Sequence, residues 1–133
     1  MTEEDAAEFY DAYLAAWNAQ DLTALCGFYT EPAFFVLPER SIALEDENVT
    51  LGFLEQVFGR LNADDYLRST YRSLSVQDCA DGMAVLDVAG IERRRRDGSL
   101  IETVDAHYVL RHNEDGGWRM TVAVICAHGW KSA

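Results

Sequence analysis

The chain has 133 residues, of which 49% are hydrophobic and 26% are charged, a balance typical of one globular domain spanning residues 1–133. Its formal net charge of −12 repels polyphosphates, so the composition disfavours a nucleic-acid-binding protein. Apolar runs are too short to span a membrane, and the acidic start MTEEDAAEF is unlike a signal peptide. We therefore expect a protein without membrane attachment.

The three cysteines, Cys26, Cys79 and Cys126, are widely spaced and form no C-x-x-C pair. Such spacing predicts reduced thiols in a cytoplasmic protein rather than a disulfide framework or a zinc site. We expect neither a metal ion nor a cofactor.

The first predicted helix begins at Thr2, whose hydroxyl can cap it, and the acidic residues 3–5 suit the positive end of the helix dipole. One face of this helix is apolar and aromatic, at three- and four-residue spacing: Phe9, Tyr10, Tyr13, Leu14 and Trp17. Asp21 is positioned to cap a short second helix that ends at about Phe28.

Two prolines, Pro32 and Pro38, bracket an apolar strand at residues 33–37, and a short extended piece follows at residues 41–44. The Asp46-Glu47-Asn48 stretch predicts a further helix start. A third amphipathic helix is indicated by apolar residues at helical spacing: Leu51, Leu54, Val57, Phe58 and Leu61.

From Tyr66 onward the pattern changes to alternation interrupted by Asp-Gly turns, which predicts four long strands at roughly residues 66–77, 83–95, 100–112 and 118–127. Helices followed by an antiparallel meander are typical of an α+β protein. We expect a strongly curved antiparallel sheet wrapped on three N-terminal helices.

The stretch YLAAWNAQDLTAL at residues 13–25, a strand ending at Pro38, a third helix and four strands closing with DGGWRMTVAV at residues 115–124 resemble the nuclear-transport-factor-2-like superfamily. That superfamily includes SnoaL-like polyketide cyclases and ketosteroid isomerases. The resemblance covers nearly the whole chain, and its motifs specify a fold better than a reaction. It implies a cystatin-like, cone-shaped α+β barrel around an apolar pocket, and a homodimer formed through the outer sheet face.

The Asp97-Gly98 turn sets the expected pairing of the two longest strands. An unbulged hairpin places Arg93 opposite Glu102 and Asp87 opposite Tyr108. Asp87 and Tyr108 then lie on the more apolar face, which should turn toward the helices. Asp105 and His107 lie on the other face, unless a bulge reverses one strand and turns them inward.

A carboxyl group among apolar neighbours has a raised pKa, so Asp87 beside the Tyr108 phenol could exchange a proton with an enol or carbonyl oxygen. A satisfied core pair is an equally good interpretation. The resemblance adds that the oxyanion-hole tyrosine of ketosteroid isomerase falls on Tyr13 and its neutral acid near Tyr108. Its general base falls on Leu37 and is therefore missing, which disfavours steroid-type isomerisation unless Asp87 replaces that base.

The candidate catalytic residues are therefore Asp87, Tyr108 and Tyr13. Alternation and the resemblance predict seven residues that line the pocket: Trp17, Phe34, Val36, Val122, Val124, Cys126 and His128. We expect a domain that binds a small apolar organic molecule, either with acid/base chemistry of the isomerase, dehydratase or polyketide-cyclase type or without it. The alternative is a non-catalytic homodimeric scaffold.

The run IERRRRDGSL at residues 91–100 places four arginines in an acidic chain. At a hairpin tip, alternation sends Arg93 and Arg95 to one face and Arg94 and Arg96 to the other, so the run is not one cationic cluster. Glu102 is the expected partner of Arg93. A role in steering an anionic ligand stays open.

Overall fold

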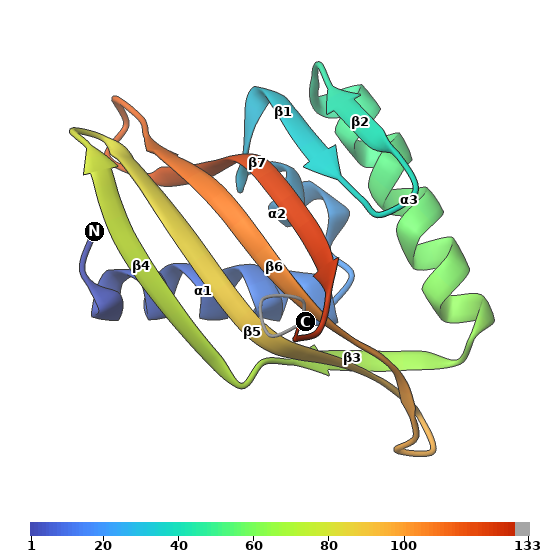
Figure 1. Cartoon of the computed structure of the whole chain (residues 1–133). Helices are drawn as coiled ribbons and strands as arrows, with labels where there is room; N and C mark the ends of the chain where they lie inside the picture. Colours follow the sequence, from blue (N-terminus) through green and yellow to red (C-terminus); the bar gives the residue numbers. More distant parts are fainter. Residues whose placement is uncertain (130–133) are drawn as a thin grey trace.

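The computed structural model of the protein describes residues 1–129, and this part of the chain folds into three helices and a seven-stranded sheet (Figure 1). The α+β class is confirmed. The helices are α1 (Glu3–Asn18), α2 (Leu22–Cys26) and α3 (Glu47–Ala63). The strands are β1 (Tyr29–Val36), β2 (Ser41–Leu44), β3 (Tyr66–Thr70), β4 (Ser73–Ala80), β5 (Met83–Arg95), β6 (Leu100–His112) and β7 (Trp118–Ala127).

Side-chain caps fix the starts of the helices where the sequence predicts them. At α1, the Thr2 hydroxyl accepts a hydrogen bond from the Asp5 amide and the Asp5 carboxylate accepts one from the Thr2 amide, both at 3.0 Å. Asp21 and Asp46 cap α2 and α3 by accepting a hydrogen bond from the amides of Ala24 and Val49, respectively. The second helix ends at Cys26, earlier than predicted, because the carbonyl of Phe28 accepts the Met120 amide and the chain enters the sheet. None of the helices within residues 1–129 is long and apolar enough to cross a membrane.

The sheet has the strand order β2-β1-β7-β6-β5-β3, with β4 also paired to β5. All neighbouring strands are antiparallel except β1 and β7, which run parallel, so the sheet is mixed. The sheet curves over α1 while α3 lies beside β1 and β2 (Figure 1). The sheet is strongly curved and stays open at its edges (Figure 1), which agrees with the curved sheet on three helices that the sequence predicts.

A β-bulge in β5 changes the register that the sequence predicts. Ile91 pairs with Val104 and Val88 pairs with Ala106, so Ala89 and Gly90 together face Asp105. Gly90 has φ +66°, a left-handed conformation that glycine adopts without strain. On the other edge of β5, the predicted strand at residues 66–77 breaks into β3 and β4 beside this bulge.

A second irregularity lies in β7, where Leu110 pairs with Met120 but Val109 pairs with Val122. The extra residue is Thr121, whose hydroxyl lies 2.7 Å from that of Thr30 on β1. Because one inserted residue reverses the side-chain alternation, the strand presents different residues to the helices before and after it.

The concave face of the sheet and the aromatic face of α1 form the core. Tyr10, Tyr13 and Trp17 are buried, as the helical periodicity predicts. They pack against aromatic residues of the sheet and of α3, including Tyr29, Phe58 and Tyr108.

Candidate functional site

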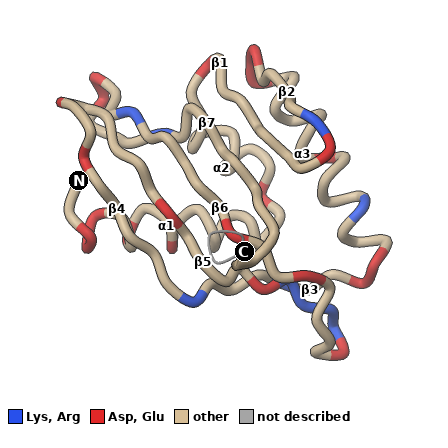
Figure 2. The backbone as a smooth tube through the Cα atoms, in the orientation of Figure 1, with Lys and Arg blue, Asp and Glu red and all other residues tan. Residues whose placement is uncertain are grey.

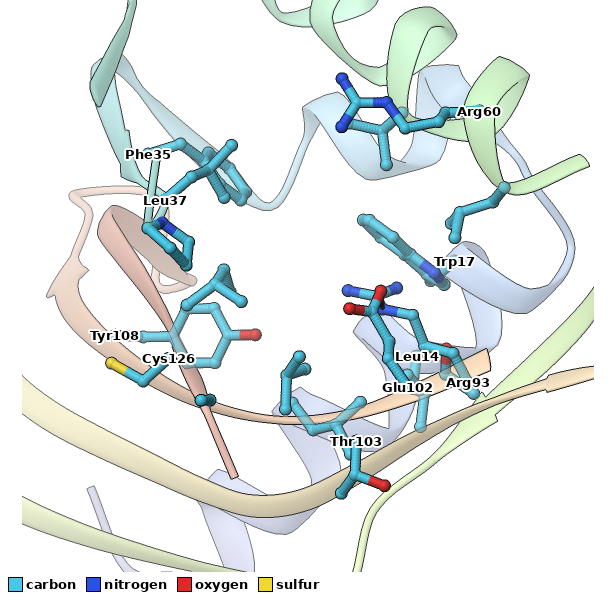
Figure 3. Close-up of a pocket in the computed structure, with 18 of the residues that line it drawn as sticks. Leu14, Trp17, Phe35, Leu37, Arg60, Arg93, Glu102, Thr103, Tyr108 and Cys126 are labelled. Atoms are coloured by element: carbon cyan, nitrogen blue, oxygen red, sulfur yellow. Dashed lines mark ion pairs between the residues drawn. The ribbon is translucent and has the colours of Figure 1, made fainter. Parts of the chain in front are cut away.

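A cavity of about 390 Å³ lies between the concave face of the sheet, α1 and α3 (Figure 3). Phe35 and Leu37 form one side, with Trp17 and Arg60 across from them. Most of the wall is apolar, and its polar groups are the hydroxyls of tyrosine, serine and threonine and a few charged side chains. Its lining includes Tyr10, Tyr13, Leu14, Trp17, Phe35, Leu37, Glu39, Val57, Arg60, Ser69, Ile91, Arg93, Glu102, Thr103, Tyr108, Ile125 and Cys126.

Four buried tyrosines form two hydroxyl pairs, and three of them, Tyr10, Tyr13 and Tyr108, line the cavity. The hydroxyl of Tyr10 lies 3.0 Å from that of Tyr108, and the hydroxyl of Tyr13 bonds that of Tyr29. Each pair holds two protons and shares one hydrogen bond, so each retains one O–H that can be donated elsewhere. The hydroxyl of Tyr108 points into the cavity (Figure 3).

Burial keeps these phenols neutral. Desolvation raises the pKa of Tyr108 to about 12, although the hydrogen bond to Tyr10 and the charge of Arg93 both act to lower it. Desolvation also raises the pKa of Tyr10 and of Tyr13 well above the ordinary range. Neutral phenols of this kind donate hydrogen bonds to a carbonyl or enolate oxygen, and they are poor bases at physiological pH.

Arg93 from β5 brings a positive charge to the cavity wall. Its Nε lies 3.3 Å from Oε2 of Glu102, the cross-strand partner that the sequence predicts. Its Cζ lies 5.3 Å from the centroid of the Trp17 ring, within the range of a cation–π contact. The Trp17 indole N–H donates to the Tyr66 hydroxyl at 3.1 Å, which fixes the ring that supports the guanidinium.

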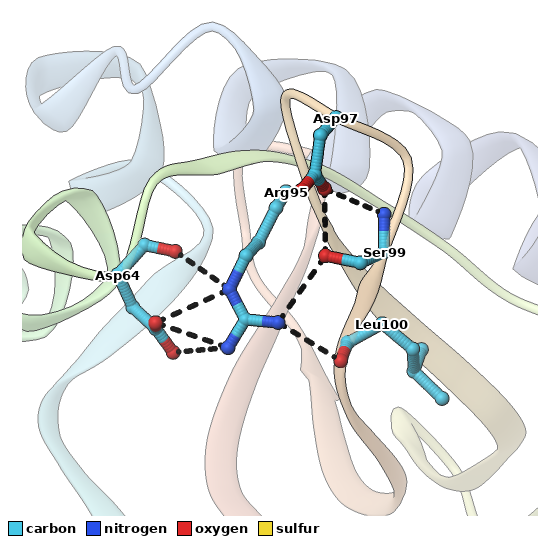
Figure 4. Close-up of polar contacts among 5 residues, drawn as sticks. All are labelled: Asp64, Arg95, Asp97, Ser99 and Leu100. Carbon is cyan, nitrogen blue, oxygen red and sulfur yellow. Dashed lines mark hydrogen bonds and ion pairs between the residues drawn. The ribbon is translucent and has the colours of Figure 1, made fainter.

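Arg95 and Arg96 of the run bind the hairpin to Asp64 and Asp65, which follow α3. Figure 2 shows these basic residues at the β5–β6 hairpin, next to acidic ones. Arg95 makes two 3.0 Å contacts with the carboxylate of Asp64 at the end of α3 (Figure 4). Asp97 accepts hydrogen bonds from the amide and hydroxyl of Ser99 and thereby closes the turn. The Arg95–Asp64 contacts hold the end of α3 against the hairpin.

Several predicted site residues meet at the cavity. Tyr13, Tyr108, Trp17 and Cys126 all line it. Leu37, the position that corresponds to the general base of ketosteroid isomerase, lines it too. The roles of Tyr13 and Tyr108 as catalytic residues stay predictions.

The predicted pairing of Asp87 with Tyr108 is wrong. The bulge at Gly90 shifts the register by one residue, so Asp87 pairs with His107 and Leu86 pairs with Tyr108. The Asp87 carboxylate lies 2.6 Å from Nδ1 of His107 on the convex face of the sheet, away from the cavity. A bulge does occur, but it turns Asp87 outward rather than turning Asp105 and His107 inward.

Five predicted pocket residues lie outside the cavity lining: Phe34, Val36, Val122, Val124 and His128. On β1 the inward residues are Ala33 and Phe35, and Phe34 is 46% exposed. Beyond the irregularity at Thr121, Ala123 and Ile125 face inward, so the valines of β7 face outward. The Nδ1–H of His128 donates a hydrogen bond at 2.8 Å to Oδ1 of the Asp105 carboxylate.

Sequence reasoning missed Arg60, Glu102 and Thr103 as cavity residues, and it predicted the Arg93–Glu102 pair without placing it in the cavity wall. The available signal was Gly90, because an isolated glycine in a strand indicates a bulge. The residues that the structure describes contain no group of three or more His, Cys, Asp or Glu side chains arranged to hold a metal ion.

The comparisons with known proteins agree with this architecture. A ketosteroid isomerase-like protein from Erwinia carotovora atroseptica has 20% sequence identity and a TM-score of 0.71, with 94% of this chain and 96% of that chain covered. ActVI-ORFA from Streptomyces coelicolor has 14% identity and a TM-score of 0.77, with coverage of 95% and 96%.

A domain of unknown function with a cystatin-like fold from Nostoc punctiforme has 18% identity and a TM-score of 0.74, with 93% and 76% covered. At these identities the likeness shows the fold alone. No curated protein sequence matches the chain. The family model described as "NTF2-like protein (DUF6841)" matches residues 3–128, and the chain belongs to this NTF2-like family.

Proposed function

We propose that the protein binds a small, largely apolar organic molecule in the cavity between the sheet, α1 and α3. The observation that carries this proposal is the 390 Å³ cavity, with its apolar wall and the Tyr108 hydroxyl directed into it. Ligand sites in proteins typically have volumes of about 300–1,000 Å³, with apolar walls and a few convergent polar groups.

The chemistry of the wall favours an aromatic carbonyl compound. Phe35, Trp17 and Tyr13 present aromatic surfaces that suit planar rings. A raised pKa keeps the Tyr108 hydroxyl protonated, so it can donate a hydrogen bond to the carbonyl oxygen.

Filling the cavity with a larger side chain is expected to weaken ligand binding. Val57 lies on α3 in the cavity wall, and Val57→Trp should weaken the binding of 2-acetonaphthone by about tenfold or more, measured by isothermal titration calorimetry. The control is Val49→Trp on the same helix, where the side chain is 40% exposed and outside the cavity lining. Equal affinities in the two variants, or no binding by the unmodified protein, would contradict the proposal.

Proton transfer at the bound carbonyl compound is the second candidate function. It is favoured by Glu102, whose carboxylate faces the same cavity as the Tyr108 hydroxyl (Figure 3). A carboxylate base with a neutral phenol donor can enolise a ketone. Deuterium exchange from D2O into the methyl group of 2-acetonaphthone, followed by NMR, should then be lost in Glu102→Gln. Exchange no faster than in buffer would leave binding as the function.

We propose that the convex face of the sheet forms the interface of a homodimer. A non-catalytic scaffold protein would use the same surface. Phe34 on β1 is 46% exposed there, and its cross-strand neighbour on β7 is Val122. Val36 lies two residues further along β1, on the same face as Phe34. Sedimentation velocity would show a dimer as twice the chain mass of 14.9 kDa. A cytoplasmic location stays a prediction.

A further inference from the structure

The guanidinium of Arg93 has unused hydrogen-bonding capacity inside the protein. The side chain is 13% exposed, and its Nε and Nη1 atoms are buried without a hydrogen-bond partner within residues 1–129. Buried N–H groups of folded proteins are nearly always paired, and those of a cation most of all. Arg93 lines the cavity, but these two atoms are shielded from solvent, so a group that enters the cavity reaches them when the guanidinium turns toward it.

Glu102 balances the charge of Arg93 without occupying these donors. Its Oε2 is 3.3 Å from Nε, yet the N–H does not point at it, so the contact is an ion pair and not a hydrogen bond. The Glu102 side chain is 48% exposed and stands at the cavity edge. Both residues line the cavity, so a ligand bound there lies next to this ion pair.

The Trp17 ring and the residues bonded to it hold the Arg93 guanidinium in position. The guanidinium lies over the Trp17 ring, whose N–H is bound to the Tyr66 hydroxyl. That hydroxyl is in turn 2.6 Å from the Ser69 hydroxyl, and the Ser69 amide donates to Asn18 at 2.8 Å. This chain of contacts from α1 to β3 keeps the planar group oriented before a ligand arrives, which reduces the entropy lost on binding.

We propose that Arg93 binds the anionic end of the ligand, and that this ligand is an aromatic carboxylate; the inference rests on the proposed function. A guanidinium fork matches the two oxygens of a carboxylate, and a dry site strengthens the ion pair. The charged groups in the wall are Arg60, Arg93, Glu39 and Glu102. With two cations and two anions there, a singly charged carboxylate suits the cavity better than a doubly charged phosphate.

The test compares 2-naphthoate with the uncharged 2-naphthamide by calorimetry. The unmodified protein should bind the naphthoate about tenfold or more tightly than the amide. Arg93→Met should remove this preference and keep naphthamide binding. The matched control is Arg94→Met, since the Arg94 guanidinium contacts Glu92 and the Gly98 carbonyl and lies outside the cavity lining. This variant changes the net charge equally and should preserve the preference.

Three results would overturn the assignment in distinguishable ways. Equal affinities for the two probes in the unmodified protein would refute the anion site and leave ligand binding intact. A preference abolished by Arg60→Met but kept by Arg93→Met would place the anion at α3 instead. If neither naphthyl probe nor 2-acetonaphthone binds, the proposed function fails and the inference with it. Should Arg93→Met not fold, as judged by circular dichroism, Arg93→Lys must still show a reduced preference, since lysine lacks the planar fork.

Discussion

Replacing Gly90 with alanine is expected to lower the free energy of unfolding by about 3 kcal/mol. One cause is the backbone, since a φ of +66° strains any residue with a Cβ. The other is space, because a Cβ at this position would lie 2.9 Å from the Cβ of Arg72. The segment around Arg72, which connects β3 and β4, would have to move away from β5 at the bulge. Urea denaturation followed by circular dichroism measures the loss.

Gly98→Ala is the matched control for this prediction. Gly98 has φ +88°, and a Cβ built there meets nothing within 4 Å. It should cost only the backbone strain, about 1–2 kcal/mol. Equal losses in the two variants would show that the close approach between Gly90 and Arg72 contributes nothing to stability.

Asp105→Asn is expected to destabilise the protein by about 2 kcal/mol at pH 7. The Asp105 carboxylate accepts hydrogen bonds from the Gly90 and Gly129 amides, each at 2.9 Å, and binds His128 at 2.8 Å. Desolvation raises the pKa of this carboxyl, but these hydrogen bonds outweigh it and lower the pKa to about 2. An asparagine keeps one acceptor oxygen and places an NH2 group against donors.

The stabilisation by the Asp105 carboxylate decreases as the pH falls. The pKa of Asp105 is lower in the folded chain, about 2, than its ordinary value of 3.8. The stabilisation is therefore complete above pH 3.8 and is lost as the pH falls toward 2. The stability difference between the unmodified protein and Asp105→Asn should shrink over this interval. A difference that stays constant from pH 5 to pH 2 would contradict the account of Asp105 as a charged acceptor.

The boundaries of the three longest strands, β5, β6 and β7, were predictable because turns and alternation are local signals. The Asp-Gly turns at residues 81–82 and 97–98 delimit β5, whose observed bounds match the prediction. Helix starts were equally accessible, since Thr2, Asp21 and Asp46 cap helices through bonds to the residue three positions along the chain. Both kinds of signal depend on neighbours in sequence.

The residues that face the cavity could not be predicted from alternation alone. A bulge at Gly90 and an extra residue at Thr121 each reverse the inward face of a strand, and both depend on contacts with distant residues. Gly90 binds the carboxylate of Asp105, and Thr121 binds Thr30. For this reason Asp87 and Val124 were assigned to the wrong face, whereas Tyr108, on the strand between the two irregularities, was assigned correctly.

The most direct test of ligand binding in the cavity is a crystal structure of the protein with 2-naphthoate. We expect the rings between Phe35 and Trp17, with the carboxylate within hydrogen-bonding distance of Nε or Nη1 of Arg93. Naphthoate bound on the convex face of the sheet, or in the cavity with its carboxylate turned away from Arg93, would contradict this assignment.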